Sequence, residues 1–252
     1  MIQTFIVCHD PRVIEHYEKT NHFGSLKDYT YILVGQQEYN GESNKVIIAR
    51  ALPVNIEDRK NLLVYTAWYA ILENNLITKD WIRLLEYDTI VNTEIEEITE
   101  EILTNYVSKP TYEIGVWGHI PYQMNNYHFI QNREWIESLD AAMKKVYSVS
   151  IKDLFADFTP EAFQNSYWMG TSNILFSKKE MKSFVEWYKP LADLVYTDPK
   201  AGHGLERALT FYCIHQEKPF NFIQHVIQHH QLNSHGTQQA GAYEENVKKI
   251  LG

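Results

Sequence analysis

The first half of the chain alternates short apolar runs with segments whose apolar residues recur at helical spacing. Residues 2–7, 29–34 and 46–49 are β-branched and aromatic runs bounded by turn-forming residues, a pattern that predicts three strands. Residues 12–19 and 58–74 show the periodicity of amphipathic helices. Because apolar strands alternate with helices, this half predicts an α/β fold with largely parallel strand pairing.

The most informative segment is an apolar run that ends in two carboxylates. Residues 81–85 predict a further buried strand, and Glu86 and Asp88 follow it, separated by Tyr87. Successive side chains of an extended segment point to opposite sides. We therefore expect Glu86 and Asp88 on one side of the chain and Tyr87 on the other.

Two carboxylates at one strand end repel each other unless a cation neutralises them. Carboxylate oxygens suit Mg²⁺ or Mn²⁺, which keep coordination positions for water and for substrate phosphates. The carboxyl end of a central strand is also the usual ligand crevice of an α/β sheet. The pair Glu86 and Asp88 therefore predicts a metal-bridged diphosphate, and the alternative is that both acids only solvate a turn.

The second half of the chain is richer in helical patterns. The expected helices, the first of them acidic and solvated, are residues 94–107, 138–149, 178–195 and 203–215. The expected strands are residues 166–176 and 220–227. Residues 112–135 mix aromatic, amide and glycine residues and do not predict one element, whereas the polar tail after Gly236 is expected to be loosely held.

Composition excludes several classes of protein. The 252 residues suffice for one large domain, and the net charge of −9 provides no attraction for nucleic acid or anionic lipid. An anionic substrate would need local help, such as a metal. Cys8 and Cys213 lie far apart, which argues against a zinc site or a disulfide framework and favours a reducing cytoplasm. No run approaches the ~18 apolar residues of a membrane span, and the first residues lack a basic targeting segment.

Three blocks together resemble a known family. Glu86-Tyr87-Asp88 follows an apolar strand, a Trp-Met-Gly-Thr-Ser-Asn block occupies residues 168–173, and a His-Gly-Leu-Glu-Arg block occupies residues 203–207. In this order they resemble nucleotide-sugar-dependent glycosyltransferases of the GT-A fold, over residues 2–235. The resemblance implies a Rossmann-like three-layer α/β/α sandwich with a central, mostly parallel mixed sheet.

The resemblance also implies a function and an organisation of the chain. A sugar would pass from a nucleoside-diphosphate sugar, with a UDP-sugar as the first expectation, to a glycan or another hydroxyl acceptor. We expect a single GT-A-like catalytic domain over residues 1–252, with a nucleotide-binding half at 1–107 and an acceptor-binding half at 108–252.

The family's Asp-x-Asp motif matches Glu86-Tyr87-Asp88 and implies a bound Mn²⁺ or Mg²⁺ ion. This chain has glutamate at the first position, so we expect Asp88 to bind the metal directly and Glu86 to assist, also through water. A C-terminal histidine often completes the metal shell in the family, and we assign this role to His235 in preference to His230.

The resemblance assigns the acceptor base to Glu206, at the start of a predicted helix. A carboxylate near the acceptor hydroxyl would take its proton as the new bond forms, which predicts inversion at the anomeric carbon. The alternative is that Glu206 only favours the helix dipole. Arg207 could pair with an acid or a phosphate, with a surface ion pair as the default.

Nucleotide binding is expected at the carboxyl edge of the first two strands. His9 and Asp10 follow the first strand and Gly35 follows the second, and nucleotides bind at that edge. Asp10 has the alternative role of capping the next helix. Arg59 could reach a phosphate or only decorate a helix face, and Tyr87 is assigned to the nucleotide together with these residues.

The sugar and the acceptor are expected near two aromatic and amide segments. Trp168, Gly170 and Asn173 offer a stacking surface, close backbone approach and paired hydrogen bonds to hydroxyls. Trp117 and His119 could extend this surface towards the acceptor. The alternative is that these aromatic residues belong to the core.

Other readings of the same residues stay open. His225 and His229 have the spacing that places two imidazoles on one helical face, but Gln228 stands beside them and no zinc-protease motif is present. A non-catalytic nucleotide-sugar or glycan-binding protein would keep the crevice without the chemistry. A metal-dependent phosphohydrolase or nucleotidyltransferase is the third class, although a nucleotidyltransferase is expected to have a glycine-rich basic loop where this chain has residues 8–12.

Overall fold

The structure is a computed structural model of the chain. It describes residues 1–35, 37–92, 94–99, 113–117, 122–123, 133–165, 167–168, 172–199, 201–223, 227–229 and 242–252.

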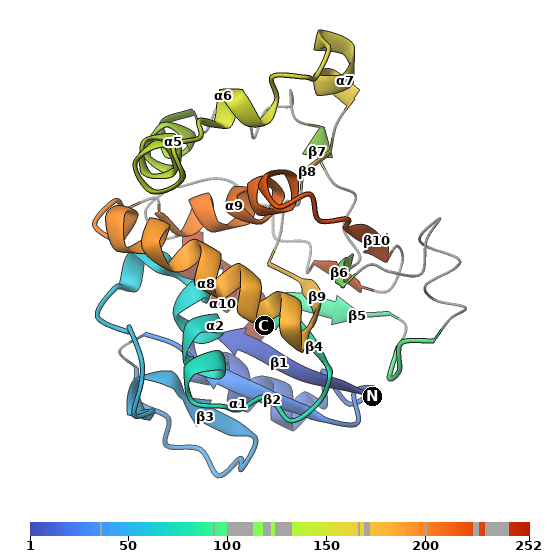
Figure 1. The fold of residues 1–252 in the computed structure, drawn as a ribbon. Helices are drawn as coiled ribbons and strands as arrows, with labels where there is room; N and C mark the ends of the chain where they lie inside the picture. The colour runs from blue at the N-terminus through green and yellow to red at the C-terminus, as the bar shows by residue number, and fades with distance from the viewer. Residues whose placement is uncertain are drawn as a thin grey trace.

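A seven-stranded sheet forms the centre of the molecule (Figure 1), with the strand order β10-β6-β9-β4-β1-β2-β3. Its strands are β1 (Ile2–Cys8), β2 (Tyr29–Leu33), β3 (Val46–Ile48), β4 (Trp81–Glu86), β6 (Ile114–Trp117), β9 (Ile174–Ser177) and β10 (Asn221–Ile223). Strand β1 pairs in parallel with β2 and β4, and β2 with β3. Strand β9 runs antiparallel to both β4 and β6, and β10 is parallel to β6. The sheet is therefore mixed and mostly parallel.

Two short antiparallel ribbons accompany the main sheet. Strand β5 (Thr89–Val91) pairs with β11 (Ile227–His229), and β7 (Tyr122–Gln123) pairs with β8 (Tyr167–Trp168). In the first ribbon His229 lies opposite Thr89, the residue after Asp88. A C-terminal segment therefore runs beside the chain that leaves the acidic motif.

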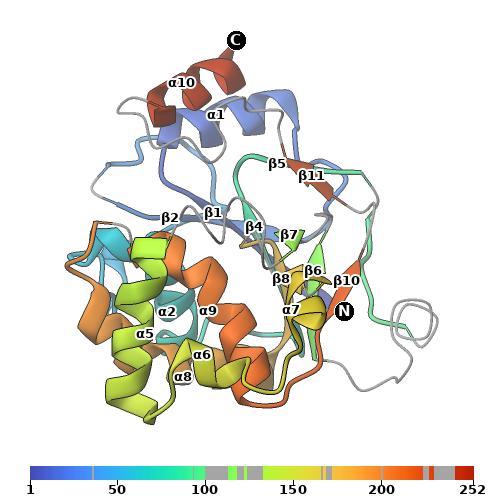
Figure 2. The same ribbon diagram turned by 90° about the horizontal axis from the view of Figure 1, so that it is seen from above.

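Helices cover both faces of the sheet, which Figure 2 shows in profile. One face carries α1 (Pro11–Thr20) and α10 (Ala242–Leu251). The other carries α2 (Val64–Glu73), α5 (Arg133–Tyr147), α8 (Lys178–Val195) and α9 (Ala201–His215), and the short helices α6 (Ile151–Leu154) and α7 (Pro160–Asn165) lie on that side as well. This arrangement confirms the three-layer α/β sandwich with a mostly parallel mixed sheet.

The alternation of side chains in β1 divides the core between the two faces. Phe5 and Val7 belong to the cluster beneath α2, α8 and α9, whereas Ile6 and Cys8 belong to the cluster beneath α1 and α10. All four are at most 2% exposed. A strand buried on both faces is rich in apolar residues, and the β-branched and aromatic residues among positions 2–7 made this strand identifiable.

Local capping explains where two of the helices begin. Asp10 is the N-cap of α1 and its carboxylate accepts a hydrogen bond from the backbone N–H of Arg12, with Pro11 at the first helical position. Ser177 caps α8 by accepting from the backbone N–H of Glu180. The helix expected at residues 178–195 is confirmed with the same bounds.

The helix expected at residues 58–74 is shorter than its periodicity suggests. A 3₁₀ turn, η2 (Lys60–Leu62), precedes Leu63, and α2 begins only at Val64. Leu63 has φ +46° and ψ −124°, a left-handed backbone conformation that interrupts the helix. Apolar spacing alone does not reveal such a break, because both sides of it keep buried apolar residues.

Two further expectations were wrong, because tertiary contacts determine both segments. Residues 94–99 form no helix, and the chain there runs beside β1, where the Ile2 N–H donates to the Glu96 carbonyl. Buried Arg83 contacts both the carboxylate of Glu94 and the carbonyl of Ile95. The remainder of the predicted helix, residues 100–107, lies outside the described residues.

The expectation of a loosely held tail fails for residues 242–251, which form α10. Val247 and Ile250 are 0% and 6% exposed and belong to the core cluster beneath α1. Glu244 also pairs with Arg12 of α1. The burial of these apolar side chains outweighs the polar composition of the tail.

The expected strands 166–176 and 220–227 divide in a similar way. The first becomes β8 and β9, which belong to different sheets, and the second ends as β10 at Ile223. His229 lies in strand β11, so the shared helical face considered for His225 and His229 is wrong for His229; His225 lies outside the described residues. Within the described ranges, no helix is long and apolar enough to span a lipid bilayer. The division into halves at residue 107 stays a prediction.

Candidate functional site

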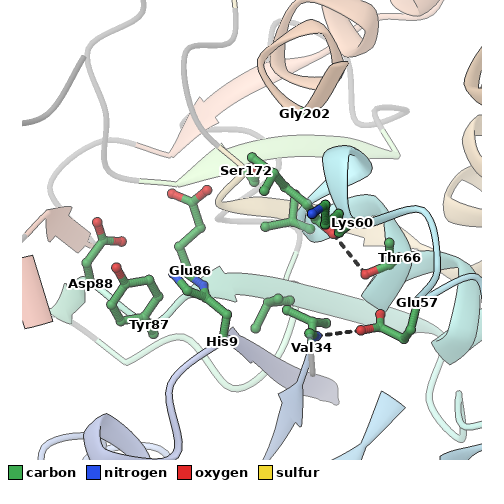
Figure 3. Close-up of a pocket in the computed structure, with 14 residues that line it drawn as sticks. His9, Val34, Glu57, Lys60, Thr66, Glu86, Tyr87, Asp88, Ser172 and Gly202 are labelled. Atoms are coloured by element: carbon green, nitrogen blue, oxygen red, sulfur yellow. Dashed lines mark hydrogen bonds between the residues drawn. The ribbon is translucent and has the colours of Figure 1, made fainter. Parts of the chain in front are cut away.

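A cavity of about 330 Å³ opens at the carboxyl ends of β1, β2 and β4. His9 lies just after β1, Gly35 just after β2, and Glu86 ends β4, so the parallel pairing of these strands brings the three residues to one edge (Figure 3). The cavity lining is Val7, His9, Val34, Gly35, Glu57, Lys60, Leu63, Val64, Thr66, Glu86, Tyr87, Asp88, Ser172 and Gly202. The predicted ligand crevice thus lies where the sequence pattern placed it.

The acidic motif lies at one end of this cavity. Glu86, Tyr87 and Asp88 all line it, and Figure 3 shows them side by side. Tyr87 and Asp88 form the turn between β4 and β5, so the alternation expected of an extended segment ends at Glu86. The Tyr87 N–H donates to the Val7 carbonyl at 3.1 Å, which ties the turn to β1. Asp88 is only 7% exposed, whereas Glu86 is half-buried.

His9 lines the cavity beside the acidic motif. Its imidazole meets the Tyr87 ring edge-on with centroids 4.7 Å apart. Burial lowers the pKa of His9 to about 4, although the nearby carboxylates of Asp88 and Asp10 act in the opposite direction. His9 is therefore neutral at physiological pH and can exchange hydrogen bonds with a ligand, but it supplies no positive charge.

Glu57 lies at the opposite end of the cavity from Asp88. It is 4% exposed and accepts a hydrogen bond from the backbone N–H of Gly35 at 2.5 Å. Burial raises the pKa of Glu57 above its ordinary value, and the hydrogen bonds from Thr66 and Gly35 oppose this shift. Gly35 has φ +88°, which a residue with a Cβ rarely adopts. Glu57 therefore holds the loop after β2 in its conformation.

Among the described lining residues, the cation is Lys60 rather than the Arg59 singled out from the sequence. The exposed Lys60 lines the cavity. Arg59 does not, because its guanidinium pairs with Asp193 and lies 4.9 Å from the Tyr196 ring centroid. These contacts agree with the alternative that Arg59 does not contact the ligand and lies outside the site. Helical periodicity could not favour Lys60 over Arg59, because the 3₁₀ turn η2 changes which of the two side chains lies at the cavity.

The roof of the cavity comes from α9 and from the chain before α2. Gly202 lines the cavity and packs so closely on Leu63 that an added Cβ would lie 2.4 Å from the Leu63 Cγ. Leu63 is 50% exposed at this rim. Glu206 is four residues after Gly202 in the same helix, and such residues share a helix face. The register of α9 therefore places the Glu206 position one turn away from the cavity roof.

Several predicted residues lie close to the cavity without lining it. Asp10 is fully buried and its carboxylate pairs with the Arg12 guanidinium at 2.6 Å, so its capping alternative is confirmed. Asn173 is also fully buried, and its side-chain oxygen accepts hydrogen bonds from the turn that carries the acids. Arg207 is 2% exposed, so the default of a surface ion pair is wrong.

The remaining predicted residues are described in part or not at all. Gly170, His119 and His235 lie outside the described residues. The structure gives only the backbone positions of Trp117 in β6, Trp168 in β8 and Glu206 in α9. Among the described residues, no three histidine, cysteine, aspartate or glutamate side chains form a group able to hold a metal. The expected third ligand, His235, therefore stays a prediction.

Nine of the fourteen lining residues were not predicted as site residues from the sequence. They include Glu57, Lys60, Leu63 and Ser172. The first three belong to the connection between β3 and α2, which carries no local motif and which the apolar spacing assigned in part to a helix. Ser172 lies in the block at 168–173 already linked to the sugar.

Comparisons with known proteins support the fold. No protein-family model matches the chain, and no curated protein matches it significantly. The apo structure of the bifunctional glycosyltransferase WbbM matches with a TM-score of 0.59 at 14% identity, over 91% of this chain and 45% of that chain. An active-site mutant of LgtC matches over 99% of this chain and 95% of that chain, at 10% identity. Its TM-score of 0.41 is too low to support an argument. The chain thus shares a fold with WbbM and spans less than half its length.

Proposed function

We propose that this chain is a metal-dependent glycosyltransferase that moves a sugar from a nucleoside-diphosphate sugar to a hydroxyl acceptor. The observation that carries the proposal is one cavity, at the carboxyl edge of a parallel sheet, with Glu86 and Asp88 at one end. Ligands of α/β sheets bind at this edge. The fold shared with the glycosyltransferase WbbM agrees with this class.

The acids fit a small divalent cation such as Mn²⁺ or Mg²⁺. Asp88 and Glu86 provide carboxylate oxygens in the same cavity. Magnesium is commonly held by one or two carboxylates, with water and substrate phosphates completing its shell. Two carboxylates therefore suffice on the protein side, and His235 is the proposed third ligand. When bound, the ion supplies positive charge to the diphosphate that leaves the sugar.

The other cavity residues bind and orient the donor. Lys60 is the cation placed to contact a phosphate, and the neutral His9 and Tyr87 contact the nucleotide through hydrogen bonds and ring surfaces. Gly35 and Glu57 bound the end of the cavity farthest from the acids. With the diphosphate at the acids, this end receives the nucleoside, and a uridine nucleotide is the proposed donor.

Glu206 is the proposed base. Its position, one helical turn from Gly202 in α9, lies near the roof of the cavity. A carboxylate there would take the proton of the acceptor hydroxyl as the oxygen attacks the anomeric carbon from the face opposite the leaving diphosphate. The proposed transfer therefore inverts the anomeric configuration. Trp117, His119, Trp168 and Gly170 are the proposed contacts to sugar and acceptor.

Ligand-dependent stabilisation tests the binding part of the proposal. The melting temperature of the purified chain is measured with uridine, guanosine, cytidine and adenosine diphosphates, each with and without MnCl₂. We expect one nucleotide to stabilise the protein with Mn²⁺ and far less without it, because a ligand that binds only the folded state raises its stability. Asp88→Asn should remove the Mn²⁺-dependent part. If none of the four pairs stabilises the wild-type chain, the proposed donor site is wrong.

Glu206→Gln tests the chemical part. This change keeps the size of the side chain and removes its ability to accept a proton. Release of nucleoside diphosphate from a nucleotide sugar, with a panel of sugar acceptors, should fall by roughly 10²–10⁴-fold while donor stabilisation stays near the wild-type level. Turnover close to wild type would rule out Glu206 as the base but leave the donor site standing. Glu186→Gln, on the exposed surface of α8, is the matched control.

A further inference from the structure

The turn that carries the acids is held by one buried amide from a different part of the chain. The side-chain oxygen of Asn173 accepts hydrogen bonds from the Glu86 backbone N–H at 2.8 Å and from the Thr89 hydroxyl at 3.1 Å. Asn173 and Thr89 are both 0% exposed. One oxygen therefore joins the residue before Tyr87-Asp88 to the residue after it.

The position of Asn173 follows from the sheet. Asn173 immediately precedes β9, whose antiparallel pairing sets Ile174 opposite Leu84 of β4. This register places Asn173 beside the end of β4, where Glu86 leaves the sheet. The bridge thus depends on the antiparallel strand that interrupts the parallel sheet.

A second contact holds the same turn from the segment that follows α1. The His22 Nε2–H donates to the Thr89 carbonyl at 2.9 Å, and the His22 ring stacks on Tyr17 of α1 with centroids 4.0 Å apart. The backbone of Thr89 also pairs with β11. Because Thr89 is held at its carbonyl by His22 and along its backbone by β11, the Asn173 oxygen has a fixed partner on one side. On the other side it holds the Glu86 backbone, which also pairs with β1.

We propose that Asn173 is a positioning residue that sets the placement of Glu86 relative to Asp88 and thereby the affinity of this pair for a divalent cation. The inference rests on the proposed function of the acid pair. A hydrogen-bond partner behind metal ligands commonly changes metal affinity by roughly 10–100-fold when it is removed. Asn173 contacts neither a phosphate nor a metal in this role; it acts through the Glu86 backbone and the Thr89 hydroxyl.

The test compares Mn²⁺ binding among matched variants. Free Mn²⁺ is counted by electron paramagnetic resonance while MnCl₂ is titrated into the wild-type chain and its variants, with and without uridine diphosphate. Asn173→Ala should weaken Mn²⁺ binding by roughly 10–100-fold. Thr89→Val keeps the shape of the side chain and removes one of the two hydrogen bonds, so it should weaken Mn²⁺ binding less than Asn173→Ala does. Thr89→Ser keeps the hydroxyl and should bind Mn²⁺ as the wild-type chain does.

A double variant and a distant amide separate positioning from loss of stability. Asn173→Ala combined with Thr89→Val should bind Mn²⁺ no more weakly than Asn173→Ala alone, because the two changes remove the same bond. The control is Asn74→Ala, since Asn74 makes three side-chain hydrogen bonds to the backbones of Val54 and Ala70, away from the acids. Asn74→Ala should lower the melting temperature without changing Mn²⁺ affinity.

Each outcome bears on a different claim. A wild-type chain that binds no Mn²⁺, alone or with uridine diphosphate, overturns the proposed metal site and the inference with it. Wild-type binding that is unchanged in Asn173→Ala overturns only the positioning role, as does an equal loss in Asn74→Ala. If Asn173→Ala does not fold, the contrast between Thr89→Val and Thr89→Ser decides, and equal affinities in those two refute the inference.

Discussion

Two glycines of α9 differ only in what surrounds them, and this difference predicts opposite effects of the same substitution. A Cβ added at Gly202 would lie 2.4 Å from both the Cγ and the Cδ1 of Leu63 and 2.9 Å from its Cβ, whereas one added at Gly204 meets no atom of the described residues within 4 Å. Both glycines lie in the first turn of the helix. Helix propensity alone would favour alanine at either position.

The expected magnitudes follow from these distances. Gly204→Ala should raise the free energy of unfolding by about 0.5–1 kcal/mol, since alanine loses less conformational entropy and meets no neighbour. Gly202→Ala should lower it by about 1–3 kcal/mol, because Leu63 must move and the space is already filled. The Leu63 Cβ, whose place is fixed by the backbone, would itself lie 2.9 Å from the added Cβ, so rotation of the Leu63 side chain alone cannot relieve the contact.

Urea denaturation followed by tryptophan fluorescence measures both variants under the same conditions. Leu63→Gly in the Gly202→Ala background should recover the loss, because it removes the obstructing side chain and permits the positive φ. The nucleoside diphosphate that stabilises the wild-type chain should stabilise Gly202→Ala less, since both residues line the cavity. Equal stabilities of Gly202→Ala and Gly204→Ala would refute the close packing of the cavity roof.

Three further predictions concern the rest of the structure. Burial raises the pKa of Glu57, so the folded state holds the proton of this carboxyl more tightly than the unfolded state does. The free energy of unfolding therefore falls as the pH rises from the ordinary pKa of the group through the raised one. Glu57→Gln should therefore be more stable than wild type at about pH 7 and lose this advantage at about pH 4, and urea midpoints that show no such pH dependence would contradict the assignment. Val247→Ala should cost about 1–3 kcal/mol in urea denaturation, because Val247 is 0% exposed beneath α1, and no change would mean that α10 is not docked. Arg59→Ala should leave stabilisation by a nucleoside diphosphate unchanged while Lys60→Ala weakens it in a salt-dependent way, and the reverse order in thermal-shift titrations would restore Arg59 to the site.

Local pattern was sufficient where the burial of a segment is uniform along its length. Strand β1 is buried on both faces and is apolar from Phe5 to Cys8, and α8 keeps one buried stripe from Met181 to Val195 after a serine cap. The acids after β4 were found for the same reason, because the end of a largely apolar run marks the edge of a sheet. For these elements the sequence carries the whole signal.

The pattern failed where a distant partner decides the conformation. Residues 94–99 are acidic and resemble a solvated helix, yet buried Arg83 holds Glu94 and these residues form no helix. The polar tail becomes α10 because two of its side chains, Val247 and Ile250, find an apolar surface on α1. Arg83 lies 11 residues before Glu94, and Arg12 of α1 lies 232 residues from Glu244, so neither cause belongs to the polar or apolar pattern of the segment itself.

The candidate site divides in the same way. Residue order and hydrophobic pattern alone were enough to predict an α/β sheet, the end of its central strand and the acids Glu86 and Asp88 at that end. The tertiary structure decided that Lys60 rather than Arg59 faces the cavity, that Glu57 closes it and that Asn173 holds the acidic turn. Glu86 and Asn173 are 87 residues apart in the sequence and meet only because strand register and side-chain packing bring them together. Register and packing depend on the whole fold, so no local pattern reveals such a contact.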